Sequence, residues 1–177
     1  MRSNKKIRGF TLVELLTAVV VSAILISIAI PSFRSLQERN AVGAVSNDLL
    51  ADVLLARSEA VKREQRVAVV PAGSSWGEQG WRVFVDVNTN DAWNDGTDVL
   101  LKSNVDSDFS NANYGVQLSG SGNAARFISF DPRGRTTQSF DSSSFISAQR
   151  GDSSRYICFS PTGRPLVVKE LNGGSCP

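Results

Sequence analysis

Residues 10–30 read FTLVELLTAVVVSAILISIAI, and the only charged side chain among them is Glu14. As a helix this stretch would span about 30 Å, the thickness of the hydrocarbon core of a bilayer. It is preceded by four basic residues and no acidic one: Arg2, Lys5, Lys6 and Arg8. The positive-inside rule therefore predicts one transmembrane helix with a cytoplasmic amino terminus and an outward carboxyl end.

Glu14 is not explained by a plain membrane anchor, because a carboxylate inside lipid costs several kcal/mol or must be protonated. A cut between Gly9 and Phe10 would create an α-amino group about one helical turn from Glu14. That amine, in the same chain or in a neighbouring one, would neutralise the carboxylate and fix the stagger between adjacent helices. An ordinary secretory signal is disfavoured, because the apolar run ends in IPSFR (residues 30–34) without an Ala-x-Ala-like site.

The run KKIRGFTLVELL, residues 5–16, resembles the class III leader and cleavage site of type IV prepilins and type II secretion pseudopilins. The resemblance implies that a prepilin peptidase cuts after Gly9 and methylates the amine of Phe10. It also implies that Glu14 guides assembly and that Pro31 lies where pilin helices bend. The segment ARSEAV, residues 56–61, resembles the GspH/FimT group of minor pilins and pseudopilins, which includes FimU-like proteins.

Beyond Pro31 the pattern becomes amphipathic, and we expect the helix to run to about residue 65. Apolar residues recur at three- and four-residue spacing, with Asp48 and Asp52 among the polar positions between them. Leu50 and Leu54 are expected to widen the apolar face. The stripe expected to pack on a sheet consists of Val42, Val45, Leu49, Val53, Ala56 and Ala60.

From Arg66 onward short period-two runs separated by turn residues predict β-strands, and no internal repeat is apparent. The fold class is therefore α+β, a type IV pilin-like fold in which a long amino-terminal helix packs on a mainly antiparallel sheet domain. The expected division is 1–9 leader, 10–30 transmembrane half, 31–65 amphipathic half and 66–177 periplasmic globular portion. The predicted strands are 66–70, 81–86, 98–102, 115–118, 126–130, 145–148, 155–160 and 165–169.

Composition argues against most enzymatic chemistry. The 177-residue chain has no histidine and two cysteines, which removes histidine-based catalytic triads, His-ligated zinc and four-thiolate metal sites. A hydrolase built on paired carboxylates stays as a minor alternative, but no pair can be assigned. No enzyme activity and no cofactor are expected.

The stretch GWRVFVD, residues 80–86, resembles a strand of the same family, and an acidic, Asn-rich loop follows it. Asp86, Asn88 and Asn90 match the first ligand positions of a calcium loop. Asp91 and Thr97 then stand where glycine and a bidentate glutamate are needed. A solvated hairpin loop is therefore favoured over a weak calcium site.

Cys158 and Cys176 are expected to form a disulfide, because the predicted orientation puts them in an outward, oxidising compartment. Pairing would constrain the unfolded chain by roughly 3 kcal/mol. The ending GSCP, residues 174–177, is similar to the Cys-containing tails of FimU- and FimT-type minor pilins.

Residues 126–177 carry seven basic and four acidic side chains. FimT-like proteins of some competent bacteria bind DNA through a Gly-Arg-x-Arg motif near the end, and neither Gly134-Arg135 nor Gly163-Arg164 completes it here. Arginines in turns are more often solvated or paired with acids such as Asp131 and Asp141. DNA contact is thus a minor hypothesis that rests on Arg133, Arg135, Arg164 and Lys169.

The sequence is interpreted as a minor pilin of the FimU/FimT type, processed at the inner membrane and packed into a type IV pilus, in the tip complex that primes assembly. The alternatives are a GspH-type pseudopilin of a type II secretion system and a DNA-binding minor pilin. The expected partners are other major and minor pilins, prepilin peptidase, the inner membrane and the pilus assembly platform. The expected location is the inner membrane, with a periplasmic carboxyl-terminal domain, and then the pilus surface.

Replacing Gly9 with a bulky residue such as Leu should block cleavage, because the peptidase must bind the backbone at the bond after Gly9. Immunoblotting should then show a precursor longer than the wild-type mature chain by the nine residues Met1–Gly9. A mature chain of normal length from this variant would rule out the cleavage site.

Overall fold

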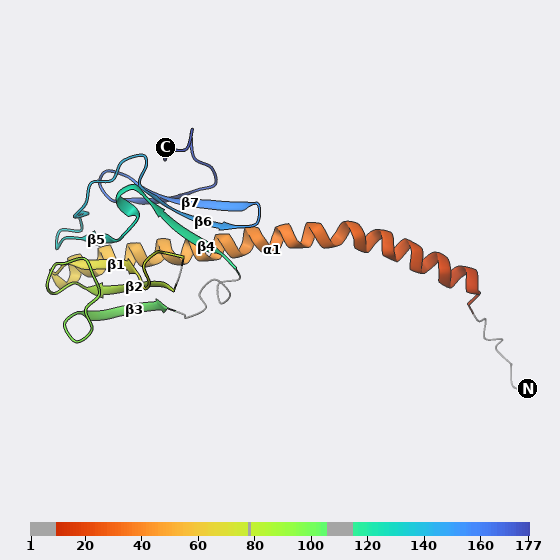
Figure 1. Cartoon of the computed structure of the whole chain (residues 1–177), viewed down its shortest axis with the longest axis horizontal. Coiled ribbons are helices and arrows are strands. Elements are labelled where there is room, and N and C mark those ends of the chain that lie inside the picture. The colour runs from red at the N-terminus through yellow and green to blue at the C-terminus, as the bar shows by residue number, and fades with distance from the viewer. Residues whose placement is uncertain (1–9, 78, 106–114) are drawn as a thin grey trace, which may run out of the picture. The chain divides into compact units, whose positions relative to one another are not determined.

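The computed structural model describes residues 10–77, 79–105 and 115–177. The leader, including Gly9, lies outside the described residues. The chain forms two compact units, Met1–Gln37 and Glu38–Pro177. One helix, α1 (Leu12–Arg63), contributes its first part to one unit and its second part to the other (Figure 1).

Helix α1 is continuous through Pro31 and ends within two residues of the expected boundary. Glu64 follows with a positive φ of 54°, and the Gln65 N–H donates to the carbonyl of Ala60 at 3.3 Å. This is the 6→1 bond of a helix terminus whose capping residue is left-handed, a position that favours glycine. The basic side chains of Lys62 and Arg63 in the last turn complement the helix dipole.

The strands form two antiparallel four-stranded sheets, and the eight predicted strands are confirmed to within a few residues at each end. The first sheet has the order β3-β2-β1-β5 and the second has the order β4-β6-β7-β8. The first sheet contains β1 (Val67–Pro71), β2 (Gly80–Val85), β3 (Val99–Val105) and β5 (Ile128–Phe130). The second contains β4 (Gln117–Ser121), β6 (Phe145–Arg150), β7 (Ser153–Phe159) and β8 (Pro165–Val168), and a 3₁₀ turn, Gly122–Ala124, joins β4 to β5.

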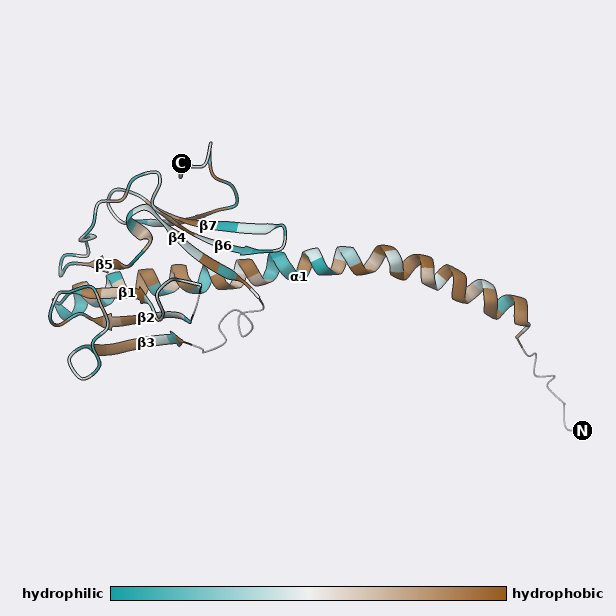
Figure 2. Ribbon diagram, viewed as in Figure 1, coloured by the Kyte–Doolittle hydropathy of each residue, from teal (hydrophilic) through white to brown (hydrophobic). Residues whose placement is uncertain are grey.

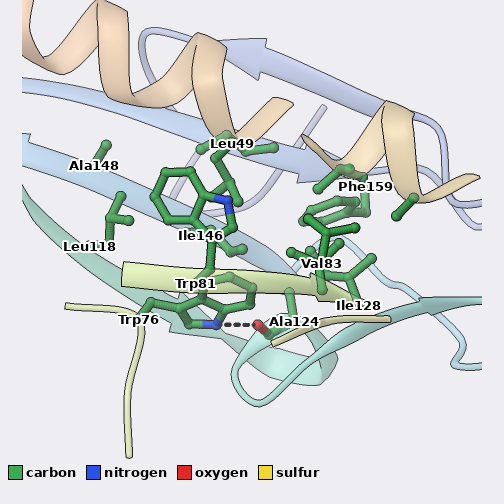
Figure 3. Close-up of a cluster of buried hydrophobic side chains, with 14 of the residues drawn as sticks. Leu49, Trp76, Trp81, Val83, Leu118, Ala124, Ile128, Ile146, Ala148 and Phe159 are labelled. Atoms are coloured by element: carbon green, nitrogen blue, oxygen red, sulfur yellow. Dashed lines mark hydrogen bonds between the residues drawn. The ribbon is translucent and has the colours of Figure 1, made fainter. Parts of the chain in front are cut away.

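The second part of α1 supplies one side of the core. The whole predicted stripe is buried, together with Ala41, and it belongs to a single apolar cluster with side chains from both sheets. Figure 3 shows Leu49 of the helix among residues of the first sheet, such as Val83, and of the second, such as Ile146. The expected widening of this face is only partly correct, because Leu50 is half-buried and Leu54 is exposed.

Trp76, in the connection between β1 and β2, joins the two sheets. Its indole is fully buried, and its Nε1 donates to the carbonyl of Ala124 at 3.0 Å (Figure 3). A Cβ atom at Gly120 in β4 would lie 2.7 Å from the Cδ1 atom of Trp76, so only glycine lets the indole pack against β4.

Asp52 of α1 is buried, although its position in the sequence pattern places it among the polar residues. Its carboxylate accepts hydrogen bonds from Trp81 Nε1 at 2.8 Å, Lys102 Nζ at 2.6 Å and Asn104 Nδ2 at 2.5 Å. These donors come from β2 and β3, so the cluster ties the helix to the outer strand of the first sheet. The pattern could not reveal this, because the donors are about 30 and 50 residues away in the chain.

Replacing Asp52 with Ala should lower the free energy of unfolding by about 2–3 kcal/mol, because it leaves three donors without their common acceptor. Urea unfolding of the full chain in detergent, followed by tryptophan fluorescence, would measure the change. The matched control is Asp48→Ala, an exposed carboxylate one turn away, expected within about 0.5 kcal/mol of wild type. Equal stability of the two variants would contradict an anchoring role for Asp52.

Candidate functional site

Glu14 lies in the first turn of α1, where it forms a capping box with Thr11. The Glu14 carboxylate accepts the backbone N–H of Thr11 at 3.0 Å and the Thr11 hydroxyl at 2.9 Å. The Thr11 hydroxyl in turn accepts the Glu14 N–H at 3.2 Å. The two residues therefore satisfy helix-terminal donors reciprocally.

The capping box gives Glu14 a local partner that the sequence argument did not consider. The signal was present as Thr-x-x-Glu before an apolar run, at residues 11–14. The contacts between Glu14 and Thr11 are solvent-exposed. Phe10 is also 86% exposed, and cleavage after Gly9 would free its α-amino group. The carboxylate can therefore exchange its bonds to Thr11 for a bond to an ammonium group.

The rest of the segment has the properties that a membrane requires. By length and composition α1 can cross a bilayer, since its most apolar 18-residue window has a mean hydropathy of 2.5. The hydroxyls of Thr17, Ser22 and Ser27 donate to the carbonyls of Glu14, Ala18 and Ile24. These hydroxyls are thereby hydrogen-bonded within the helix, which is required in lipid because no water is present there to bind them. Figure 2 shows the apolar character of this part of α1.

The acidic loop between β2 and β3 is held by its own carboxylates. The Asp86 carboxylate is buried and accepts the N–H groups of Asn90 and Asp91 at 3.1 and 3.0 Å. Asp98 accepts the N–H groups of Val87 and Asn94 at 3.0 and 2.7 Å. These oxygens face N–H donors rather than an open centre, and no group of metal-ligating side chains occurs among the described residues. The hairpin loop is confirmed, but Asp86 is buried rather than solvated.

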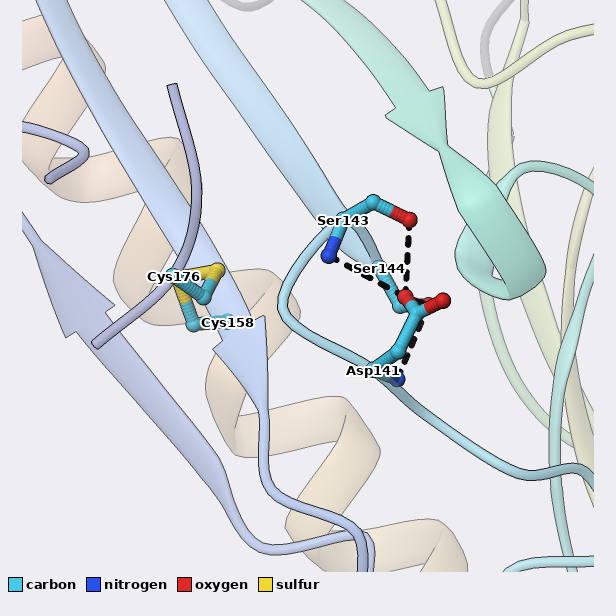
Figure 4. The surroundings of a disulfide bond; sticks show 5 residues. All are labelled: Asp141, Ser143, Ser144, Cys158 and Cys176. Atoms are coloured by element: carbon cyan, nitrogen blue, oxygen red, sulfur yellow. Dashed lines mark hydrogen bonds between the residues drawn. A yellow bond between two sulfur atoms is a disulfide. The ribbon is translucent and has the colours of Figure 1, made fainter. Parts of the chain in front are cut away.

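Cys158 of β7 and Cys176 of the tail form a disulfide with a Cα–Cα distance of 5.7 Å. The Cys176 N–H also donates to the carbonyl of Ser142 at 2.7 Å. The loop that contains Ser142 is held by Asp141, whose carboxylate accepts the hydroxyls of Ser144 and Ser143, each at 2.7 Å (Figure 4). These bonds, from Ser144 first and then from Ser143, lower the pKa of Asp141.

Two similar turns, one directly after β5 and one between β7 and β8, each carry an arginine. The sequences are FDPRGRT, residues 130–136, and FSPTGRP, residues 159–165, a short repeat that the sequence analysis missed. In the first turn the Asp131 N–H donates to the carbonyl of Arg135, and the Asp131 carbonyl accepts the N–H of Gly134. Ser160 makes the same backbone bonds with Arg164 and Gly163 in the second turn. In both turns the side chain of this first residue also accepts the N–H of the arginine. The turns touch, because a Cβ atom at Gly163 would lie 2.0 Å from the Cγ2 atom of Thr136.

One residue makes the two turns electrostatically different. Asp131 in the first turn binds the Arg135 guanidinium at 3.0 Å, whereas Ser160 has no charge to offer Arg164. Burial alone would raise the pKa of Asp131, but the hydrogen bonds from Arg135 and Arg133 lower it. Arg133, Arg164 and Lys169 are exposed and have no ion pair among the described residues. The structure therefore brings the two turns into contact, and in the first of them Asp131 neutralises Arg135.

Two family models match the chain. The model described as type II transport protein GspH matches residues 45–163, which is more than half of the chain. The model of the prokaryotic N-terminal methylation motif matches residues 4–30. None of the curated protein sequences compared with the chain matches it.

The fold is similar to that of the type IV minor pilin FimU of Pseudomonas aeruginosa, strain PAO1. One crystal structure of FimU aligns with a TM-score of 0.52 and 15% identity, covering 77% of this chain and 93% of FimU. A second crystal form gives a TM-score of 0.48 and 15% identity, covering 71% and 91%. At this identity the likeness concerns the fold alone, a long amino-terminal helix packed on antiparallel sheets.

Replacing Asp141 with Asn should destabilise the protein at neutral pH and have little effect in acid. The lowered pKa means that the ionised carboxylate stabilises the folded state above the unfolded value near 3.9, and that this contribution is lost as the pH falls through the folded pKa. The urea midpoints of variant and wild type should differ at pH 7, and the difference should shrink as the pH falls below the ordinary range of an aspartate. Asp152→Asn, in the exposed β6–β7 turn, serves as control. A difference in urea midpoint that persists unchanged at low pH would contradict stabilisation by the ionised carboxylate of Asp141.

Proposed function

The chain belongs to the GspH family of type II transport proteins, and we propose that it is a minor pilin that is incorporated into a type IV pilus, within the tip complex that primes assembly. Prepilin peptidase removes residues 1–9 by cutting after Gly9 and methylates the new amine of Phe10. Glu14 is the assembly carboxylate, and Pro31 is the point at which α1 bends in the fibre. Membership of a family of structural pilins favours a structural role over an enzymatic one.

The observation that carries this proposal is the exposure of the apolar side chains at the start of α1. In the single chain they face solvent, although the helix is one of the most apolar segments of the sequence. A soluble monomer rarely exposes so large a contiguous apolar surface. Lipid covers it before assembly and the helices of neighbouring subunits cover it afterwards. The side chains include Leu12, Val13, Leu15, Leu16, Val19, Val20, Val21, Ile24, Leu25, Ile26, Ile28 and Ile30.

The same features support the proposal that the chain lies in the inner membrane before assembly. The basic leader stays in the cytoplasm, residues 10–30 span the bilayer, and the two-sheet domain lies in the periplasm. The Cys158–Cys176 disulfide supports this orientation, because disulfides persist in oxidising compartments. After assembly the domain lies on the pilus surface.

A GspH-type pseudopilin is the second candidate, and the description of the matching family model favours it. A pseudopilin would use the same leader, Glu14 and two-sheet domain in a fibre of the type II secretion system. Deleting the gene separates the candidates, since loss of pili supports the first and loss of protein secretion supports the second. A DNA-binding role has less support, because Asp131 neutralises Arg135, one of the four cationic residues on which such a role would depend.

Replacing Glu14 with Ala should leave membrane insertion intact and reduce incorporation into fibres by about tenfold or more, because the ammonium group of Phe10 would lose its partner in an apolar environment. Immunoblots of sheared fibres and of membrane fractions would measure both quantities. Normal incorporation of the Ala variant would refute the pairing of Glu14 with an amine.

The capping box supplies a matched control, Thr11→Ala. This change removes the local partner of the Glu14 carboxylate but leaves the carboxylate itself. Incorporation close to wild type is expected if Glu14 acts between subunits. A loss equal to that of Glu14→Ala would show instead that Glu14 serves only to cap its own helix.

A further inference from the structure

The face of the first sheet that points away from α1 carries an apolar cluster of its own. Ala68 and Val70 of β1 and Phe84 of β2 are buried there, separate from the main core. Trp93 of the acidic loop and Phe127 pack against them, and the rings of Phe84 and Trp93 meet edge-to-face at 5.3 Å. The loop thus folds back over the sheet instead of extending into solvent.

The loop that carries Trp93 is fixed in place before any ligand binds. Besides the bonds of Asp86 and Asp98, the loop is bound by Arg66, the residue directly before β1. The Arg66 guanidinium donates to the carbonyl of Thr89 at 2.8 Å and pairs with the Asp91 carboxylate at 3.3 Å. A wall held in this way binds a partner with little loss of conformational entropy.

A cavity of about 580 Å³ lies between this loop, the residues after β1 and the residues before β5. Two cationic residues, Arg82 and Arg126, line it beside Trp93 and Phe127. Arg82 stands opposite Val70 in the ladder, so it lies on the outer face of the sheet. One nitrogen of its guanidinium, Nη1, reaches the carbonyl of Ala72 at the cavity wall, at 3.4 Å.

The cavity has an excess of positive charge. Within the part of the chain that the structure describes, neither Arg82 nor Arg126 forms an ion pair. Among the described residues that line the cavity, the only carboxylate belongs to Asp91, which is already paired with Arg66. A planar guanidinium with unused N–H groups is well suited to bind a carboxylate, and the adjacent rings favour an apolar or aromatic group beside it.

We propose that this cavity binds an acidic side chain, with an aromatic residue next to it, from a segment of another fibre subunit. The identity of the partner rests on the proposed function, whereas the chemistry of the site does not. Two cations in a recess provide too few contacts for a phosphate backbone, whose binding depends on neutralising many phosphates in a row. The surrounding segment is also acidic, with seven acids and two bases in residues 78–108, which would repel a polyanion.

Trp93 provides a direct readout on the purified full chain in detergent. The chain has three tryptophans, and Trp76 and Trp81 are buried, so Trp93 is the one that a ligand in the cavity would touch. The probe is N-acetyl-Phe-Asp-amide, with N-acetyl-Phe-Asn-amide as the uncharged counterpart. We expect a saturable fluorescence change with millimolar Phe-Asp peptide and at least about tenfold weaker binding of the Phe-Asn peptide.

Arg82→Gln should weaken binding of the Phe-Asp peptide about tenfold, and Arg133→Gln, in an exposed turn outside the cavity, should leave it unchanged. Circular dichroism establishes that each variant is folded. If Arg82→Gln does not fold, Arg126→Gln replaces it as the test variant, and weaker binding of the Phe-Asp peptide to that variant is expected. The proposal is overturned by the absence of a saturable response, by equal affinity for both peptides, by wild-type affinity in the deciding variant, or by tighter binding of an oligothymidylate at the same site. None of these results depends on fibre incorporation, which the Glu14 variants test separately.

Discussion

The burial of one stripe of α1 holds the globular unit together. The seven buried apolar side chains of α1 between Ala41 and Ala60 form a single cluster with residues of both sheets, while no strand of one sheet pairs with a strand of the other among the described residues. The two sheets are therefore held together by shared apolar contacts rather than by hydrogen bonds between strands. Alanines in the stripe allow close approach of the helix, and Trp76 fills the remaining junction because Gly120 leaves room for it.

Two carboxylates on the same helix are satisfied in different ways, and the difference fits the anchoring of Asp52 and the assembly role proposed for Glu14. Asp52 is buried and receives three donors from β2 and β3, so it fixes the helix within its own domain. The Glu14 carboxylate is exposed and, within the described part of the chain, accepts hydrogen bonds only from Thr11, three residues away. A carboxylate with local, exposed partners can exchange them for a partner in another chain, whereas Asp52 cannot be released without opening the core.

The loops show how single residues set local charge without changing the backbone. The turns at Asp131 and Ser160 have the same backbone bonds, yet Asp131 neutralises its arginine and Ser160 leaves Arg164 unpaired. In the acidic loop, the carboxylates of Asp86 and Asp98 accept hydrogen bonds from backbone N–H groups of the loop itself. A segment that is strongly acidic by composition therefore borders a cavity whose unpaired side chains are cationic. Counting charges along the chain could not show this, because pairing cancels some charges and leaves others.

The sequence alone determined the apolar helix, the buried stripe, the eight strands and the family, because these depend on periodicity and on neighbouring residues. It also indicated the residues at which processing and assembly are proposed, since the motif is contiguous at residues 5–16. Only the tertiary structure decided that Asp52 is buried, that Leu54 is exposed, that two turns meet at Thr136 and that Arg82 and Arg126 line one cavity. Each of these depends on groups far apart in the chain, and the free energy of a polar group depends on which distant partners the fold brings to it.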